Sequence, residues 1–280
     1  MKLAALSLSA SLLVLVSCAT HDPPLRAPSG DFGGLAAAIA HERLGDDTER
    51  DRYRHPEATL RFFDVQPNHT VAEYAPAGGW YMKILAPYVA SEGRYVGVSF
   101  RGEQTGIERL EKALAGWDTG FPAQVEQMTG VPADRVAAYY ATDIPEDARG
   151  TVDRIVIPRM VHNLLRWNIA DAELRGLRTL LKDDGLVGIV QHRAKPDSPW
   201  AYGDGNKGYL READVIALMS VHGFVLVGKS EVNANPNDTA DYENGVWTLP
   251  PSLRLGDVDR DKYVAIGESD RATLLFAKAK

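Results

Sequence analysis

Residues 71–81 read Val-Ala-Glu-Tyr-Ala-Pro-Ala-Gly-Gly-Trp-Tyr, a short apolar run with one acid, then a turn of small residues and the start of a helical pattern. Small residues let the backbone of such a turn approach a ligand closely, and the first N–H groups of the next helix face that ligand. Glu73 stands two residues before the turn, within reach of a polar group of a bound molecule. The pattern predicts a nucleotide-type cofactor site. Only Gly78 and Gly79 are glycines, and Ala75 and Ala77 stand where a dinucleotide fingerprint has glycine.

Signatures of other chemistry are missing from the sequence. Its histidines form no His-x-x-x-His pair, and no His/Cys pair has the spacing of metal ligands, so we expect no metal. No Gly-x-Ser-x-Gly elbow of a serine hydrolase occurs, and the turn lacks the Gly-Lys-Ser/Thr ending of a Walker loop.

The first residues predict export. A run without charge or proline spans residues 3–16 after Lys2, which is the length of the apolar part of a signal peptide and short for a membrane span. The end of this run, Leu-Val-Ser-Cys at 15–18, resembles the lipobox of bacterial lipoproteins, in which cleavage precedes a cysteine that is then lipidated. Cys18 is the only cysteine, so no internal disulfide can form. The alternative is a simple secretory signal with a chance cysteine.

By the same resemblance, the lack of an acid at Ala19 and Thr20 fits a periplasmic lipoprotein anchored to the outer membrane. We expect residues 1–17 to be a signal peptide and residues 18–50 to hold the lipidated cysteine, a tether and an N-terminal helix. Residues 51–280 would form one domain, because their number suits a single core. The formal net charge is −7, and loss of the signal peptide removes one lysine, which disfavours a nucleic-acid partner.

Strand and helix patterns alternate through this domain, as in an α/β fold with a mostly parallel sheet. Strands are predicted at residues 70–74, 94–98, 136–140, 152–157, 186–191, 224–227 and 273–277. Helices are predicted at residues 56–63, 79–89, 171–181 and 210–222. Residues 104–130 show a helical pattern that is interrupted by Gly116 and Gly120.

Seven strands with a long excursion between the sixth and the seventh are the layout of class I S-adenosylmethionine-dependent methyltransferases. That fold is a Rossmann-like, doubly wound sheet whose last strand is antiparallel. The chain resembles, in particular, the bacterial family of exported predicted methyltransferases, from about residue 50 to its end. The similar stretches are residues 54–63, 73–81, 84–88, 159–163, 191–194, 246–251 and 266–271. Ala77 replaces a glycine of the family, which could crowd the cofactor or narrow the turn.

The resemblance implies S-adenosyl-L-methionine as cofactor. Glu73 would position its methionine part, and the backbone of Ala75, Pro76, Ala77, Gly78 and Gly79 would line the cleft. The usual ribose acid is replaced by Ser99, a poorer clamp, and Asp143 stands where such enzymes contact the adenine amino group. The alternatives are a helix-dipole charge for Glu73 and a cap or turn residue for Asp143.

Catalytic roles in this fold fall after the fourth strand. His162 could act as a general base, with Asn163 and Arg159 beside it, because the pKa of histidine lies near neutrality. The alternative is that His162 and Asn163 cap the next helix. After the fifth strand, His192 and Arg193 would bind substrate, and an arginine there suits a carboxylate or phosphate, although a surface ion pair explains Arg193 equally well.

The leading hypothesis is a methyltransferase that acts on a small molecule or an envelope component. The alternatives are a non-catalytic ligand-binding lipoprotein on the same fold and a different reaction in the same pocket, because a fold does not fix a function.

Replacing Cys18 by serine tests the lipoprotein prediction. In bacteria fed a radiolabelled fatty acid, we expect the wild-type chain to carry the label and to sediment with membranes. The Cys18→Ser variant should lose both properties, because it has no thiol to acylate, whereas a Ser17→Ala control should keep them. An unlabelled wild-type chain would favour the simple secretory signal.

Overall fold

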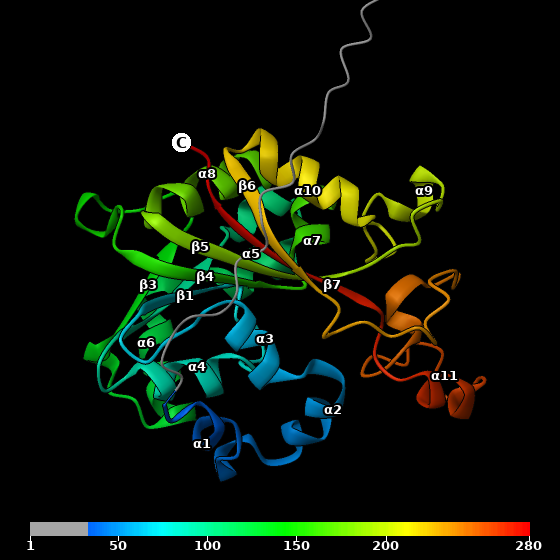
Figure 1. The fold of residues 1–280 in the computed structure, drawn as a ribbon, viewed down its shortest axis with the longest axis horizontal. Coiled ribbons are helices and arrows are strands. Elements are labelled where there is room, and N and C mark those ends of the chain that lie inside the picture. Colours follow the sequence, from blue (N-terminus) through cyan, green and yellow to red (C-terminus); the bar gives the residue numbers. More distant parts are fainter. Residues whose placement is uncertain (1–32) are drawn as a thin grey trace, which may run out of the picture.

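The computed structural model describes residues 33–280. The predicted signal peptide, Cys18 and most of the predicted tether lie outside the described residues. The described residues form one seven-stranded sheet in the order β3-β2-β1-β4-β5-β7-β6 (Figure 1). Its strands are β1 (Thr70–Tyr74), β2 (Arg94–Ser99), β3 (Val136–Tyr140), β4 (Val152–Pro158), β5 (Leu181–His192), β6 (Phe224–Ser230) and β7 (Arg271–Lys278).

The strand directions confirm the predicted fold class. Strands β1 to β5 pair in parallel, whereas β7 runs antiparallel to both β5 and β6. The observed bounds match the sequence pattern closely, with one large difference in β5. This strand begins at Leu181 rather than at residue 186, because the polar residues 182–184 are extended although they interrupt the apolar run.

Helices cover both faces of the sheet. They are α1 (Leu35–Ile39), α2 (Asp51–Arg54), α3 (Pro56–Phe62), α4 (Met82–Val89), α5 (Glu108–Leu114), α6 (Trp117–Thr129), α7 (Val161–Arg166), α8 (Ala170–Leu180), α9 (Trp200–Gly203), α10 (Glu212–Val221) and α11 (Arg260–Ile266). Five 3-10 segments complete the described elements: η1 (Glu42–Arg50), η2 (Gly102–Thr105), η3 (Ala133–Arg135), η4 (Glu146–Ala148) and η5 (Gly245–Thr248).

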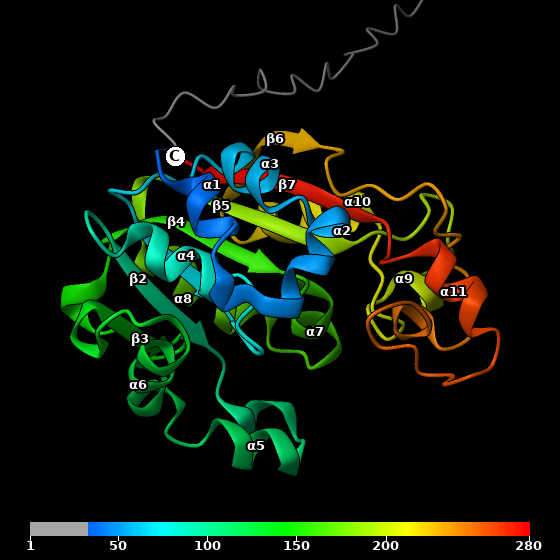
Figure 2. The same ribbon diagram turned by 90° about the horizontal axis from the view of Figure 1, so that it is seen from below.

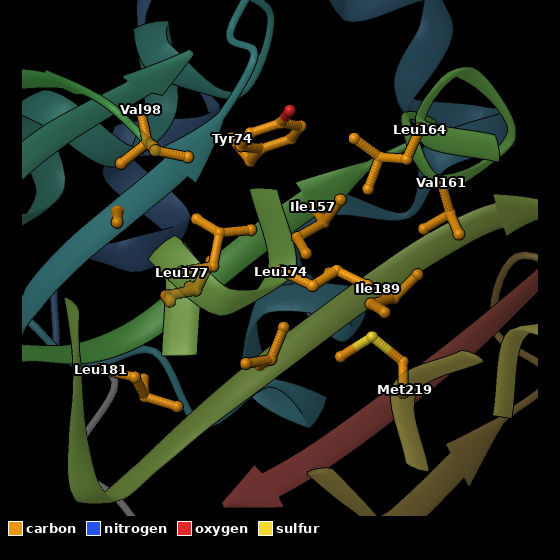
Figure 3. Close-up of a cluster of buried hydrophobic side chains, with 14 of the residues drawn as sticks. Tyr74, Val98, Ile157, Val161, Leu164, Leu174, Leu177, Leu181, Ile189 and Met219 are labelled. Atoms are coloured by element: carbon orange, nitrogen blue, oxygen red, sulfur yellow. The ribbon is translucent and has the colours of Figure 1, made fainter. Parts of the chain in front are cut away.

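Each face of the sheet has its own apolar core. On one face, α7, α8 and α10 contribute residues such as Leu164, Leu174 and Met219, which Figure 3 shows packed against strand residues including Ile157 and Ile189. On the other face, α1, α3, α4 and α6 supply the apolar side chains. Because both faces are covered, the parallel strands can be apolar throughout.

Two helix predictions need correction. Gly120 does not interrupt a helix but lies inside α6. It is exposed to solvent there, so the lack of a side chain removes no packing contact. Gly116, at a φ of 65°, does mark a boundary, because it precedes α6. The helix predicted from residue 79 begins at Met82, since residues 79–81 still belong to the preceding turn.

The turn between β1 and α4 has an unusual backbone. Ala75, Ala77 and Gly79 have φ values of 51°, 46° and 78°, in the left-handed region that favours glycine. The positive φ of Gly79 disfavours any other residue there, and a Cβ would also lie 2.6 Å from Cε of Met82, the flexible end of a side chain that would have to move. Gly78 has no positive φ, and a Cβ there would meet no atom within 4 Å. The turn is therefore tight at Gly79 and open at Gly78.

The segment before residue 51 packs against the domain. Leu35 and Leu44 are 0% and 2% exposed within the core that contains α3 and α4. The packed unit thus begins before the predicted domain start. Figure 2 shows α2 lying toward the end of the sheet at which β4 and β5 finish, with α7 and α11 toward the same end. Within residues 33–280, no helix is both long and apolar enough to cross a membrane.

The strain at Ala77 predicts that glycine is the better residue there. A left-handed conformation costs a non-glycine residue about 1–2 kcal/mol, and the extra freedom of glycine in the unfolded chain offsets part of this gain. We therefore expect Ala77→Gly to raise the free energy of unfolding by about 0.5–1 kcal/mol in urea titrations. Gly79→Ala should lower it by more than that. A loss of stability in Ala77→Gly equal to that in Ala72→Gly, a β1 control without positive φ, would contradict the strain.

Candidate functional site

A cavity of about 420 Å³ opens at the carboxyl ends of β1, β4 and β5, a volume typical of small-molecule sites. Carboxyl ends of parallel strands are where ligands bind in open α/β sheets. The lining residues come from the N-terminal segment, the turn after β1, the ends of β4 and β5, and η5. They are Asp47, Arg50, Arg54, Glu73, Ala75, Pro76, Ala77, Gly78, Gly79, Trp80, Tyr81, Pro158, Arg159, Met160, His162, Asn163, His192 and Trp247.

The turn forms one wall, as the sequence predicted. The backbone N–H of Ala75 donates to the carbonyl of Val98 at 2.7 Å, and that of Gly79 donates to the carbonyl of Pro76 at 2.8 Å. These two bonds fix the turn against β2 and close it on itself. The backbone of residues 75–79 therefore faces the cavity in a defined shape, with room at Gly78.

Glu73 is the acid of this wall. It lies on β1, is 1% exposed, and its Oε2 accepts a hydrogen bond of 2.8 Å from the hydroxyl of Tyr95. Burial raises the pKa of Glu73 to about 7, although the Tyr95 bond and the charge of Arg159 act in the opposite direction. Near neutral pH, Glu73 therefore exchanges readily between a carboxylate and a neutral acid. Glu73 lies on β1, and α4 begins only at Met82, so Glu73 is not the N-terminal helix charge of the alternative interpretation.

His162 and His192 meet at the cavity, with ring centroids 5.6 Å apart. His162 lies in α7, and its backbone N–H donates to Oε1 of Gln191 at 3.3 Å, while Nδ1 of His192 lies 2.5 Å from Oγ of Ser269. Burial lowers the pKa of His162 to about 4 and that of His192 well below its ordinary value. Both rings are thus neutral at pH 7, and within residues 33–280 neither Nε2 forms a hydrogen bond.

Arg159 and Asn163 frame His162. Arg159 follows β4 with a φ of 56°, a conformation that is costly outside glycine and that collects at functional sites. Asn163 donates to Sδ of Met160 at 3.3 Å, and no side chain caps the start of α7. The helix-capping alternative for His162 and Asn163 is therefore not what the structure shows. Both side chains line the cavity instead.

Three predicted site residues do not line the cavity. Ser99 is buried at the end of β2, with 2% exposure. Asp143 is 73% exposed and pairs with Arg101 at 2.9 Å. The guanidinium of Arg193 is bound by Glu231, Asp270 and Glu212, so its geometry is that of the ion-pair alternative. Glu231 and Asp270 raise its pKa.

Sequence reasoning gave no role to several residues of the site. Arg50 and Arg54 come from η1 and α2, and Arg54 stacks over Trp80 with its Cζ 4.7 Å from the ring centroid. Trp247 arrives from the excursion between β6 and β7, with its ring centroid 6.2 Å from that of His162. Arg54 and Trp247 lie in stretches that carried the family resemblance, and that signal could have marked them. In the described part of the chain, no cluster of His, Cys, Asp or Glu could hold a metal ion.

Comparisons with known proteins concern the fold. No protein-family model and no curated protein matches the chain. A geranyl diphosphate methyltransferase in complex with SAM is 14% identical over 92% of this chain and 98% of that chain, with a TM-score of 0.50. The [4+2]-cyclase SpnF is 14% identical over 92% of this chain and 97% of that one, also with a TM-score of 0.50. A SAM-dependent methyltransferase from Aquifex aeolicus is 18% identical over 73% and 94% of the two chains, with a TM-score of 0.44.

The likenesses to the geranyl diphosphate methyltransferase and to SpnF concern the fold alone. The chain has the Rossmann-like fold of class I methyltransferases.

Proposed function

We propose that the protein is an S-adenosylmethionine-dependent methyltransferase that acts on a small molecule or an envelope component. The observation that carries the proposal is the β1–α4 turn, whose backbone from Ala75 to Gly79 borders a cavity together with the buried acid Glu73. The same placement follows from the fold, because ligands of open α/β sheets bind at the carboxyl ends of the strands.

The residues of the cavity fit the methionine end of this cofactor. Glu73 offers a carboxylate to its ammonium group, and the open space at Gly78 lets the cofactor approach the backbone. The ribose and adenine contacts predicted at Ser99 and Asp143 have no such support, because neither residue lines the cavity. When bound, the cofactor supplies a methyl group that is electrophilic because it is attached to a sulfonium.

The protein's own task is then to orient a nucleophile and to take its proton. His162 is neutral at pH 7, so its Nε2 can accept a hydrogen bond from a hydroxyl or amine placed in the cavity. Its pKa of about 4 is well below the near-neutral value that the sequence-based prediction assumed, so it is a weaker general base than an ordinary histidine. Asn163 and Arg159 stand beside it to hold the substrate. Holding the reacting groups in line supplies much of the acceleration.

A second candidate is a ligand-binding protein, or an enzyme of another reaction, on the same fold. The positions of Ser99 and Asp143 away from the cavity favour it. The fold also suits more than one activity, since SpnF is described as a [4+2]-cyclase. Binding of the methyl donor separates the two candidates.

We further propose that the protein is an exported lipoprotein of the outer membrane. Support comes from the lipobox-like residues 15–18 and from the uncharged run before them. The proposal is tested by the Cys18→Ser experiment.

Calorimetry with the purified protein tests the methyl-donor site. We expect S-adenosylhomocysteine to bind with a micromolar Kd. Gly78→Leu should weaken binding by at least about tenfold, because the new side chain enters the open space beside the turn. Gly120→Leu is the matched control, since Gly120 also has no positive φ and no atom within 4 Å of a Cβ, but lies in α6. No binding at millimolar ligand, or equal effects of the two substitutions, would refute the proposal.

The raised pKa of Glu73 predicts a pH dependence of the same binding. With a pKa of about 7, the ionised fraction of Glu73 rises from about a tenth at pH 6 to about nine tenths at pH 8. Only the carboxylate attracts the ligand's ammonium group, so affinity should rise by up to about tenfold over this range. Glu73→Gln should bind weakly and with a flat pH profile. A wild-type profile that is equally flat would argue against this contact.

A further inference from the structure

Four arginines gather around one carboxylate beside the cavity. Oε1 of Glu268 accepts from Nε of Arg50 at 2.8 Å, and its Oε2 accepts from Nε of Arg54 at 3.0 Å and from Nη1 of Arg271 at 3.1 Å. Arg159 lies in the same electrostatic field. Burial lowers its pKa to about 10, Glu268 acts to raise it and Arg271 acts to lower it, so the group is still cationic at pH 7. The carboxylate of Glu268 thus binds three guanidinium groups and acts electrostatically on a fourth, that of Arg159.

Some guanidinium N–H groups of these arginines have hydrogen-bond acceptors and others have none. Arg271 also donates from Nη2 to the carbonyl of Tyr53 at 2.6 Å, and from Nε to that of Ser269 at 3.2 Å. By contrast, Nη2 of Arg50 and both Nη atoms of Arg54 are buried without an acceptor in the described part of the chain. Arg54 itself is only 2% exposed. Buried polar atoms almost always have partners, so these three call for one.

Arg159 completes the set. Among the described contacts its side chain forms no hydrogen bond and no ion pair, although it lines the cavity next to His162. Its backbone φ of 56° holds this position at a cost in energy. Arg50, Arg54 and Arg159 all line the one cavity, and we call these three residues the arginine wall.

The other ionisable groups of the cavity do not neutralise the arginine wall. Asp47 pairs with Lys83 at 2.6 Å. Glu73 is near half-ionised at pH 7 and is bound by Tyr95, and both histidines are neutral because burial lowers the pKa of each. An excess of positive charge therefore remains in a partly buried site, where it is costly without a counter-charge.

We propose that the molecule that receives the methyl group carries a carboxylate or phosphate, which the arginine wall binds. Guanidinium forks match both groups with paired hydrogen bonds. Arg159 lines the cavity and is only partly buried, so its donors can reach such an anion, while the buried Nη groups of Arg50 and Arg54 add positive charge beside it. The methionine end of the cofactor is a poorer candidate for this partner. With its ammonium group bound by Glu73, it brings a single carboxylate, which does not balance the excess positive charge of four guanidinium groups around Glu268.

The anion would also orient the reaction. Arg159 and His162 line the same cavity; Arg159 directly follows β4, and His162 lies at the start of α7. A substrate tethered at Arg159 by its acidic group would hold a neighbouring hydroxyl or amine near His162. This inference rests on the proposed methyl transfer, whereas the anion site itself does not.

Calorimetry with inorganic pyrophosphate and with malonate tests the site in the purified protein. The titrations are made with the free protein and with protein saturated with S-adenosylhomocysteine. We expect at least one of the two anions to bind in both states, and Arg159→Gln to weaken that binding by at least about tenfold. Arg175→Gln is the control, because Arg175 is exposed on α8 and its one ion pair within residues 33–280 is with Asp171. Arg54→Gln should weaken anion binding as Arg159→Gln does. If the Arg54 variant does not fold, the comparison of Arg159→Gln with Arg175→Gln decides the test.

Two outcomes would overturn the proposal. The first is that neither anion binds, or that Arg159→Gln binds as well as Arg175→Gln does. The second is that S-adenosylhomocysteine displaces the anion while 5′-methylthioadenosine, which lacks the amino-acid end, does not; the wall would then serve the cofactor's own carboxylate. If the anion binds through Arg159 but S-adenosylhomocysteine does not bind at all, the anion site stands and the methyltransferase proposal fails.

Discussion

The buried carboxylate of Glu268 is the contact on which the site depends. It joins Arg50 and Arg54, more than 200 residues earlier in the chain, to Arg271 at the start of β7. Without it, three guanidinium groups would face one another in a buried place, and a buried pair that loses one partner is strongly destabilised. The cavity's cationic side exists because this one acid holds the N-terminal segment against the sheet.

The antiparallel direction of β7 explains how Glu268 comes to lie there. A strand parallel to β5 would begin beside the amino end of β5. Strand β7 instead begins beside the carboxyl end of β5, where His192 lies opposite Arg271. The residues that precede β7 therefore reach the cavity edge. Ser269 contacts His192, Asp270 binds Arg193, and Glu268 binds the arginines. One reversed strand thus supplies the supports of both the histidine pair and the cationic side.

The sequence predicted the sheet well because its strands are apolar runs bounded by turn residues, and it predicted the turn at Gly78 and Gly79 because few residue types fit such a backbone. His162 and His192 followed from their places after strands. Arg159 was predicted and Arg54 lies in a stretch of family resemblance, but their grouping with Arg50 into the arginine wall could not be predicted, since these residues become neighbours only in the folded chain. The same limit applies to Arg193, whose partners come from three other segments.

The contacts of Glu268 with Arg50 and Arg54, far earlier in the chain, have a consequence for biosynthesis. Arg50 and Arg54 are synthesised more than 200 residues before their carboxylate partner Glu268 and before strand β7, which lies between β5 and β6. A growing chain therefore holds an incomplete cavity until residues 268–278 have been added. A fragment that stops before residue 268 would lack both the strand between β5 and β6 and the carboxylate that binds Arg50 and Arg54 of its own N-terminal segment.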